Sequence, residues 1–294
     1  MATTSTDRPD TKSNLTRLLN GFTLEMTAKD VERLEAAAPD IPQGTRISVT
    51  FLPGEEFPAR VHAAGVVKKL GFVPVPHISA RRLTSEAELE GFLGDLAGQV
   101  GIENAFVIAG DPPVPEGPYE DALAVIRTGK LQQYGVKHVG ISGYPEGHSE
   151  IPTPKLWQAM RDKRKTLEEM GLDYSVMTQF GFDAPPVLEW LEQMKAEGVT
   201  VPIHVGVAGP AGIKTLLGYA KRCGVGVSTK VAMKYGLSIT QLIGSAGPDT
   251  IIEELAEGLD PARHGNVRLH FYPFGGLGKT AEWIKEYKAK HRVE

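Results

Sequence analysis

Polar side chains suited to proton transfer or ligand binding recur where short apolar segments of the chain end. Glu25 lies in FTLEMT, Asp111 follows AFVIAG, and Gln179 lies in YSVMTQF. A carboxyl group can give or take a proton, and a glutamine amide offers a donor and an acceptor on one planar group. The other polar residues that end or follow such segments are Thr50, His77, Tyr144 and His148. A fold that brings these segment ends together would create a site for acid–base catalysis on a bound ligand.

Each of these residues also has a structural interpretation that the sequence leaves open. Glu25 could be an exposed glutamate at the rim, because alternation along a strand does not say which face lines the interior. Asp111 stands in a loop of glycine and prolines, where an aspartate commonly caps a turn. His77 could be a hydrogen-bonded core histidine or a ligand contact at the end of a strand.

The segment GYPEGHSE places Tyr144, Glu146, His148 and Glu150 within seven positions but predicts no metal site. Its spacing matches no helical pair such as H-E-x-x-H, and Cys223 is the only cysteine of the chain. We therefore expect Tyr144 and His148 to form hydrogen bonds to a ligand. GGLGKT at 275–280 lacks the first glycine of a P-loop, and the glycine-rich GVAGPAG at 206–212 is too weak a signal to predict a phosphate site alone.

The elements that must position these residues alternate regularly along the chain. Strand-like segments begin near Phe22, Ile47, Val73, Ala105, His138, Tyr174, Val201 and Val267. Helical periodicity spans Ala28–Ala37, Ala59–Leu70, Glu86–Val100, Tyr119–Tyr134, Pro154–Met170, Pro185–Glu197, Gly212–Arg222 and Ala281–Lys290. This alternation predicts an α/β fold, a single-domain TIM (β/α)8 barrel whose site lies at the carboxyl ends of its strands. Two extra helical stretches, Thr229–Ile243 and Asp249–Leu259, predict an enlarged connection between strands seven and eight.

Composition narrows the class of protein. The 294 residues carry 32 Lys and Arg against 36 Asp and Glu, a net charge of −4, which does not favour a nucleic-acid partner. Apolar residues make up 41% of the chain but form no run long enough for a membrane span, and no apolar signal region begins it, so we expect a cytoplasmic protein. Residues 1–14 are polar and predict a disordered tail, and residues 15–294 the barrel. A homo-oligomer is compatible with these features.

Seven short motifs occur together in an order typical of one family. FTLEMT, SVTF, PHIS, GDPP, GYPEGH, MTQFGFD and HFYP resemble the motifs of methylenetetrahydrofolate reductases, and the resemblance runs from about Gly21 to Lys290. It implies a TIM barrel that reduces 5,10-methylenetetrahydrofolate to 5-methyltetrahydrofolate with NADH or NADPH, usually through bound FAD.

The resemblance also implies roles for individual residues. Glu25 resembles the family's general acid, Asp111 the aspartate beside pterin and flavin, and Gln179 the glutamine that holds the folate ring. The positions that resemble flavin contacts are Thr50, His77, Tyr119, Tyr144 and His148. The resemblance also implies that Thr50, Phe182 and Phe274 bind the folate substrate together with Gln179. Within Pro154–Gly171 the basic residues Arg161, Lys163, Arg164 and Lys165 could meet a phosphate.

Departures from the family pattern favour a branch without flavin. Ala109 stands where the family often has an arginine that contacts FAD, and Ile213 replaces an aromatic residue that stacks on nicotinamide. The resemblance therefore favours direct hydride transfer from NAD(P)H in a ternary complex, as in the short, flavin-free members of the family. The alternatives are the same reaction by ping-pong through FAD, an idle barrel that binds folate or a nucleotide, and a barrel reductase with a deazaflavin carrier.

Overall fold

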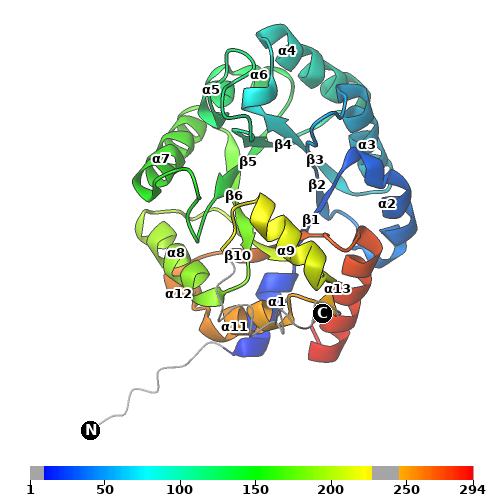
Figure 1. Ribbon diagram of the computed structural model, residues 1–294, viewed down its shortest axis with the longest axis vertical. Helices are drawn as coiled ribbons and strands as arrows, with labels where there is room; N and C mark the ends of the chain where they lie inside the picture. The colour runs from blue at the N-terminus through cyan, green and yellow to red at the C-terminus, as the bar shows by residue number, and fades with distance from the viewer. Residues whose placement is uncertain (1–9, 227–244, 294) are drawn as a thin grey trace.

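Eight parallel strands close into a barrel, which confirms the predicted fold class (Figure 1). The computed structural model describes residues 10–226 and 245–293. The strands follow one another around the barrel in the order β1, β10, β7, β6, β5, β4, β3, β2. They are β1 Thr23–Met26, β2 Arg46–Val49, β3 Val73–Ser79, β4 Asn104–Ile108, β5 His138–Gly143, β6 Asp173–Gly181, β7 Ile203–Ala208 and β10 Val267–Tyr272. Each predicted strand is present.

Helices surround the barrel and cover its outer face (Figure 1). They are α1 Thr11–Leu19, α2 Val31–Ala37, α3 Phe57–Lys69, α4 Glu86–Asp95, α5 Ala122–Arg127, α6 Lys130–Gln133, α7 Thr153–Glu169, α8 Ala184–Ala196, α9 Ile213–Arg222, α11 Asp249–Gly258, α12 Pro261–His264 and α13 Leu277–His291. Short turns of 3-10 helix lie at η1 Ala28–Asp30, η2 Ala38–Asp40 and η3 Ala80–Arg82, and a π-helical segment, η4 Leu96–Val100, continues α4. Outward residues of the strands, such as Leu24 and Phe271, pack against the helices in one large apolar core.

Alternation along the strands sends every second residue into the barrel, and there the interior is partly polar. A small apolar cluster of Val75, Phe106 and Met177 fills part of it. Buried histidines share the interior, including His204 at 3% and His270 at 0% exposure. Small polar side chains accompany them, as where Thr23 Oγ1 lies 2.7 Å from Nδ1 of His270. Thr23 and Glu25, two positions apart on β1, thus belong to the inward face.

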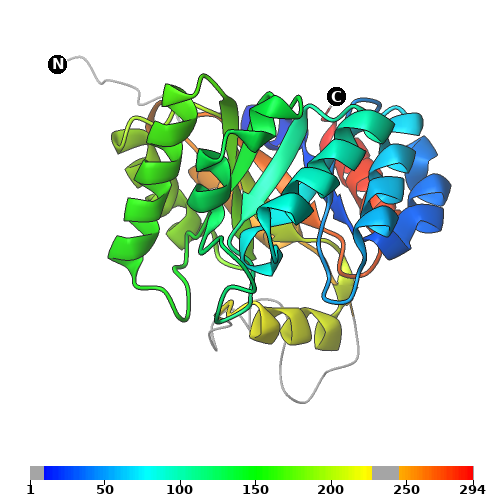
Figure 2. The same ribbon diagram turned by 90° about the horizontal axis from the view of Figure 1, so that it is seen from above.

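The connection from β7 to β10 is enlarged, as predicted. It contains a two-residue antiparallel pair, β8 Ala211–Gly212 and β9 Ser245–Ala246, together with α9, α11 and α12. Figure 2 shows α9 across one end of the barrel, outside the ring of helices. The helix expected at Thr229–Ile243 lies outside the described residues, and that expected at Asp249–Leu259 is confirmed as α11.

The predicted disordered tail of residues 1–14 is wrong for its last four residues. Asp10 caps α1, which begins at Thr11, and Asn14 is buried at 1% exposure. The Asn14 side-chain amide donates to the carbonyls of Ala256 and Leu259 at 2.9 and 2.7 Å. Packing against α11 therefore orders a segment whose own composition is polar. Residues 1–9 lie outside the described part of the chain.

The single helix expected over Tyr119–Tyr134 is in fact two, α5 and α6. Gly129 separates them with a φ of 71°, a left-handed conformation that glycine adopts without steric cost. Thr128 ends α5, and its hydroxyl accepts the Lys130 N–H at the start of α6. No helix among residues 10–226 and 245–293 is long and apolar enough to cross a membrane.

Candidate active site at the barrel mouth

Glu25 lies inside the mouth of the barrel, between two histidines from other strands. Its side chain is 17% exposed, and its Oε2 lies 3.8 Å from Nε2 of His77 on β3 and 3.9 Å from Nε2 of His270 on β10. β10 pairs with β1 directly, and β3 lies on the other side of β1, beyond β2. Closure of the barrel therefore brings both histidines to Glu25. The structural alternative of an exposed rim glutamate is thereby excluded.

The two imidazoles are held firmly around this carboxyl group. His270 is fixed through its Nδ1 by the hydroxyl of Thr23, which leaves its Nε2 facing Glu25. The His77 ring lies 4.8 Å from that of Phe106, and the guanidinium of the buried Arg60 donates to the His77 carbonyl. Burial lowers the pKa of His77 to about 4, so this imidazole is neutral at physiological pH. Within the described residues, both ring nitrogens of His77 are buried without a hydrogen-bond partner, and Nε2 is the one that faces Glu25.

Gln179 lies at an irregularity near the end of β6. The register of β6 against β7 shifts between Met177 and Phe180, and a bulge of this kind re-aims the side chains inside it. The Gln179 Oε1 accepts the Phe180 N–H at 3.1 Å, which fixes the amide plane and leaves the NH2 group as a donor. Gln179 shares a small cleft with Tyr144, His148 and Cys223. The structure thus brings together three residues that the sequence analysis assigned to ligands.

Asp111 occupies a different position from Glu25. Its side chain is 72% exposed, and one oxygen accepts from Nε and Nη2 of Arg82 at 2.9 and 2.7 Å. Arg82 also lies 3.4 Å from Glu116. The loop after β4 is anchored further by Arg81, whose Nε donates to the Glu120 carbonyl at 2.7 Å. Asp111 is therefore an ion-paired residue of the rim.

The other predicted contacts divide between the mouth and the packed layers. Tyr144 and His148 lie together, with their rings 5.4 Å apart edge to face, and Thr50 follows β2 with its N–H bonded to the Met26 carbonyl. Tyr119 is buried at 6% exposure, and its pKa is raised by burial and then by Glu86 of α4. The structure therefore places Tyr119 among the outer helices.

Aromatic rings connect α9 to the mouth. Phe274 stacks on Tyr219 of α9 at 4.0 Å and 14°, and lies 5.7 Å from Tyr272 at the end of β10. Phe182 is 4% exposed and packs edge to face on Phe180 beneath this group. The structure thus gives Phe182 a packing role, whereas the half-buried Phe274 lies where a ligand could reach it.

Three residues of this site were missed by the sequence analysis. His270 stands in HFYP, a motif that was noted, but only the barrel reveals that it faces Glu25. Tyr219 is an aromatic residue in a helical segment, a pattern that usually indicates packing in the core, yet it stacks on Phe274. Arg82 stands in an Arg-Arg pair after β3, and nothing in its spacing points to Asp111. No group of three or more His, Cys, Asp or Glu side chains within the described residues is arranged to hold a metal ion.

Comparisons with known proteins agree with the architecture of this site. The family model described as methylenetetrahydrofolate reductase matches residues 23–281. Methylenetetrahydrofolate reductase 2 of Saccharomyces cerevisiae is 29% identical over 114 residues, which cover 36% of this chain and 19% of that protein. Methylenetetrahydrofolate reductase 1 of Schizosaccharomyces pombe is 25% identical over 201 residues, 65% of this chain and 32% of that protein. The matched region thus spans less than two thirds of either fungal relative.

A solved structure shares the fold. An uncharacterised protein from Clostridium thermocellum superposes with a TM-score of 0.59 over 95% of this chain and 99% of that one. The two sequences are 12% identical, so this similarity concerns the barrel alone.

Proposed function

Because the chain belongs to the methylenetetrahydrofolate reductase family, we propose that it reduces 5,10-methylenetetrahydrofolate to 5-methyltetrahydrofolate with NAD(P)H, by direct hydride transfer in a ternary complex. The observation that carries the proposal is the placement of Glu25. This carboxyl group lies in the mouth of the barrel with two imidazoles beside it, where a proton donor for a bound folate is needed. The Clostridium thermocellum protein of the same fold binds 5-methyltetrahydrofolate, which supports a folate in such a barrel.

The reaction requires a proton before a hydride. The five-membered ring of the substrate opens when the bond between the methylene carbon and N10 breaks, and N10 keeps the electron pair and takes a proton. Glu25 would donate that proton, a role in which a positioned carboxylic acid is effective. His77 is neutral at physiological pH and would therefore contact Glu25 as an uncharged imidazole, without placing a positive charge beside the carboxyl group. The hydride then moves from the nicotinamide to the cationic methylene carbon, which becomes the methyl group, and NAD(P)⁺ is formed.

Gln179 and Asp111 would act on binding and charge. The Gln179 NH2 group is available to an acceptor on the edge of a pterin, since its own oxygen is already bonded to the Phe180 N–H. Asp111 lies at the rim, and its charge is paired with that of Arg82. It would therefore stabilise the iminium cation only by a long-range electrostatic effect. We therefore give Asp111 a smaller share of catalysis than Glu25.

The residues around Ala109 fit the pyrophosphate of FAD poorly. Charge-assisted hydrogen bonds from cationic side chains normally hold such a group. Here Ala109 supplies none, and the nearby Arg82 already contacts two carboxylates, Asp111 and Glu116. The charges around Ala109 thus favour direct hydride transfer from NAD(P)H over transfer through a flavin.

Initial-rate kinetics test the route. NADH oxidation is measured at several fixed concentrations of methylenetetrahydrofolate, with protein purified without added flavin. Direct transfer requires both substrates to be bound together, so the double-reciprocal lines should intersect and the protein should be colourless. Yellow protein with parallel lines would indicate a ping-pong reaction through FAD instead.

The same assay tests the proposal of an idle barrel. A binding protein without activity would show no folate-dependent NADH oxidation, although calorimetry would still detect folate. That result would overturn the proposed reaction while leaving folate binding intact.

A further inference from the structure

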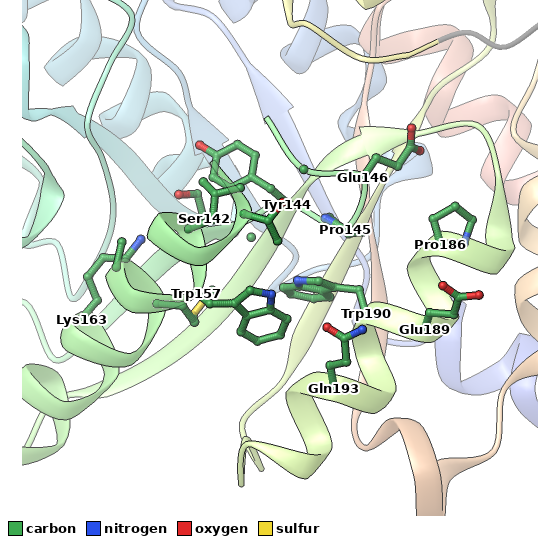
Figure 3. Close-up of a pocket in the computed structure, with 16 residues that line it drawn as sticks. Ser142, Tyr144, Pro145, Glu146, Trp157, Lys163, Pro186, Glu189, Trp190 and Gln193 are labelled. Atoms are coloured by element: carbon green, nitrogen blue, oxygen red, sulfur yellow. The ribbon is translucent and has the colours of Figure 1, made fainter. Parts of the chain in front are cut away.

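A cavity of about 500 Å³ lies beside the barrel mouth, between α7 and α8 (Figure 3). Its wall toward the barrel is the segment Ser142–Gly147, and its other walls come from the two helices. Tyr144 to Gly147 also line the small cleft that contains Gln179. The cavity is therefore a neighbour of the candidate active site, separated from it by one short loop.

Two tryptophans lie next to each other in the wall of this cavity and are tilted against one another. The rings of Trp157 on α7 and Trp190 on α8 are 6.1 Å apart and inclined by 33°. Gly143 allows Trp190 to lie against the strand, because a Cβ at that position would come within 2.7 Å of the indole. Indole faces of this kind bind planar heteroaromatic rings, with a gain that varies little with the identity of the ring.

Lys163 supplies a cation at one side of the indole surface. The residue is buried, with 7% of its surface exposed, and Figure 3 shows its amine turned toward Ser142. Among the described residues, no hydrogen bond or ion pair is formed by this amine. Burial lowers the pKa of Lys163 to about 8, with Asp121 acting in the opposite direction, so the amine is a charged donor near neutral pH.

The neighbouring basic residues of α7 are engaged elsewhere. Arg161 forms a bidentate pair with Glu197, Arg164 donates to the Glu197 carbonyl, and the 75% exposed Lys165 lies 3.8 Å from Glu169. Of the four residues that the sequence offered as phosphate contacts, the structure selects Lys163.

We propose that this cavity binds the adenosine diphosphate end of NAD(P)H, with a phosphate on Lys163 and the adenine on Trp157 and Trp190. The inference rests on the proposed function, which requires a dinucleotide whose nicotinamide reaches the mouth. Glu189 and Gln193 lie on the opposite side of the indoles from Lys163 (Figure 3), where they can accept hydrogen bonds from the exocyclic amine of adenine. The loop Tyr144–Gly147 would lie under the middle of the dinucleotide.

The charges of the cavity favour this occupant over the glutamate tail of folate. The tail and the pyrophosphate of the dinucleotide each bring two negative charges to Lys163, but only the dinucleotide also brings a hydrogen-bond donor to the carboxylate of Glu189. The benzoyl ring of folate has no exocyclic primary amine for Glu189. An adenylate places its anionic part on the lysine and its amine on the carboxylate.

Direct binding of ADP tests the site without catalysis. We expect calorimetry to detect ADP binding to the full chain, and K163M to weaken it about 10- to 100-fold, since a hydrogen bond to a charged group is lost. Methionine keeps the aliphatic stem of the lysine. K165M removes a charge from the exposed side of the same helix and should bind ADP as the native chain does. W157A, at a half-buried position, gives a second measure, with an expected loss of about tenfold.

Steady-state kinetics identify which substrate uses the cavity. In K163M the KM for NADH should rise, while the KM for reduced nicotinamide mononucleotide, which lacks the adenylate, and the KM for folate should not change. A rise in the folate KM alone would overturn the proposal in favour of the glutamate tail. Unaltered ADP affinity in both K163M and W157A, or no ADP binding at all, would also overturn it. If ADP binding depends on Lys163 but the native chain oxidises no NADH, the cavity assignment stands and the proposed reaction fails.

Discussion

Glu25 acquires its chemical setting from residues that are remote in the sequence. His77 follows it by 52 positions and His270 by 245, yet their Nε2 atoms lie 3.8 and 3.9 Å from its carboxyl group. Thr23, two residues before Glu25 on the same inward face, holds His270 in this orientation. β1 thus contributes both the carboxyl group of Glu25 and the Thr23 hydroxyl that positions the neighbouring His270.

Replacing the Glu25 carboxyl with an amide should separate catalysis from folding. We expect E25Q to fold normally and to lose about 10²- to 10⁴-fold in kcat, because glutamine has the same shape but cannot donate the proton to N10. The measurement is folate-dependent NADH oxidation, with the thermal unfolding midpoint as a check of the fold. E150Q makes the same change at an exposed position and should retain full activity. Native turnover by E25Q would remove Glu25 from the mechanism.

At the scale of elements, α1 packs beside α11 and β10 in the layer of helices outside the barrel (Figure 1). Leu15, Leu18 and Leu19 pack into the main core, and Asn14 connects α1 to the end of α11. The last carbonyls of a helix have no partner within it, so a buried helix end needs donors from elsewhere. Asn14 supplies two such hydrogen bonds.

Removing the Asn14 amide should destabilise the chain. N14A leaves the carbonyls of Ala256 and Leu259 buried without these donors, at a cost of roughly 1–3 kcal/mol in the free energy of unfolding. Urea denaturation measures the difference. The matched control is S13A, one residue earlier on the exposed face of α1, for which we expect a change within about 0.5 kcal/mol. Equal stabilities of N14A and S13A would show that α1 is not held through Asn14.

At the scale of the whole molecule, the barrel interior keeps two histidines, His77 and His204, uncharged. Burial lowers the pKa of His77 to about 4, and burial with a smaller effect of His270 lowers that of His204 to about 3. An unfolded chain returns both imidazoles to water, where they protonate near pH 6.5. Protons therefore bind preferentially to the unfolded state between these values.

This difference predicts a loss of stability in mild acid. Because the unfolded state binds more protons, the free energy of unfolding should fall as the pH decreases from about 6.5 to about 4, at roughly 1.4 kcal/mol for each unit by which a pKa is lowered. Urea denaturation at a series of pH values measures the slope. H204Q should show a shallower slope than the native chain, whereas H62Q, at an exposed position, should not change it. Identical slopes for H204Q and the native chain would show that the burial of His204 does not cause the loss of stability in acid.

Local patterns in the sequence were sufficient for the eight strands, most of the helices and the enlarged connection. Periods of two and 3.6 residues are properties of neighbouring positions, and the alternation of the two element types already restricts the topology. The family motifs likewise pointed to Glu25 and Gln179 as candidate site residues, because motif spacing is local, and their roles stay predictions. The errors, in α1 and in the division of α5 from α6, arose where distant packing or a left-handed glycine decided the outcome.

The surroundings of each group depended on the closed barrel and on helix packing. Which face of β1 lines the interior follows only from closure, and so does the meeting of Glu25 with His77 and His270. The pairing of Asp111 with Arg82 and the cavity between α7 and α8 join segments that share no pattern in the chain. Periodicity reports on residues a few positions apart, whereas charge pairing, burial and cavity shape depend on distances in space that only the folded chain creates.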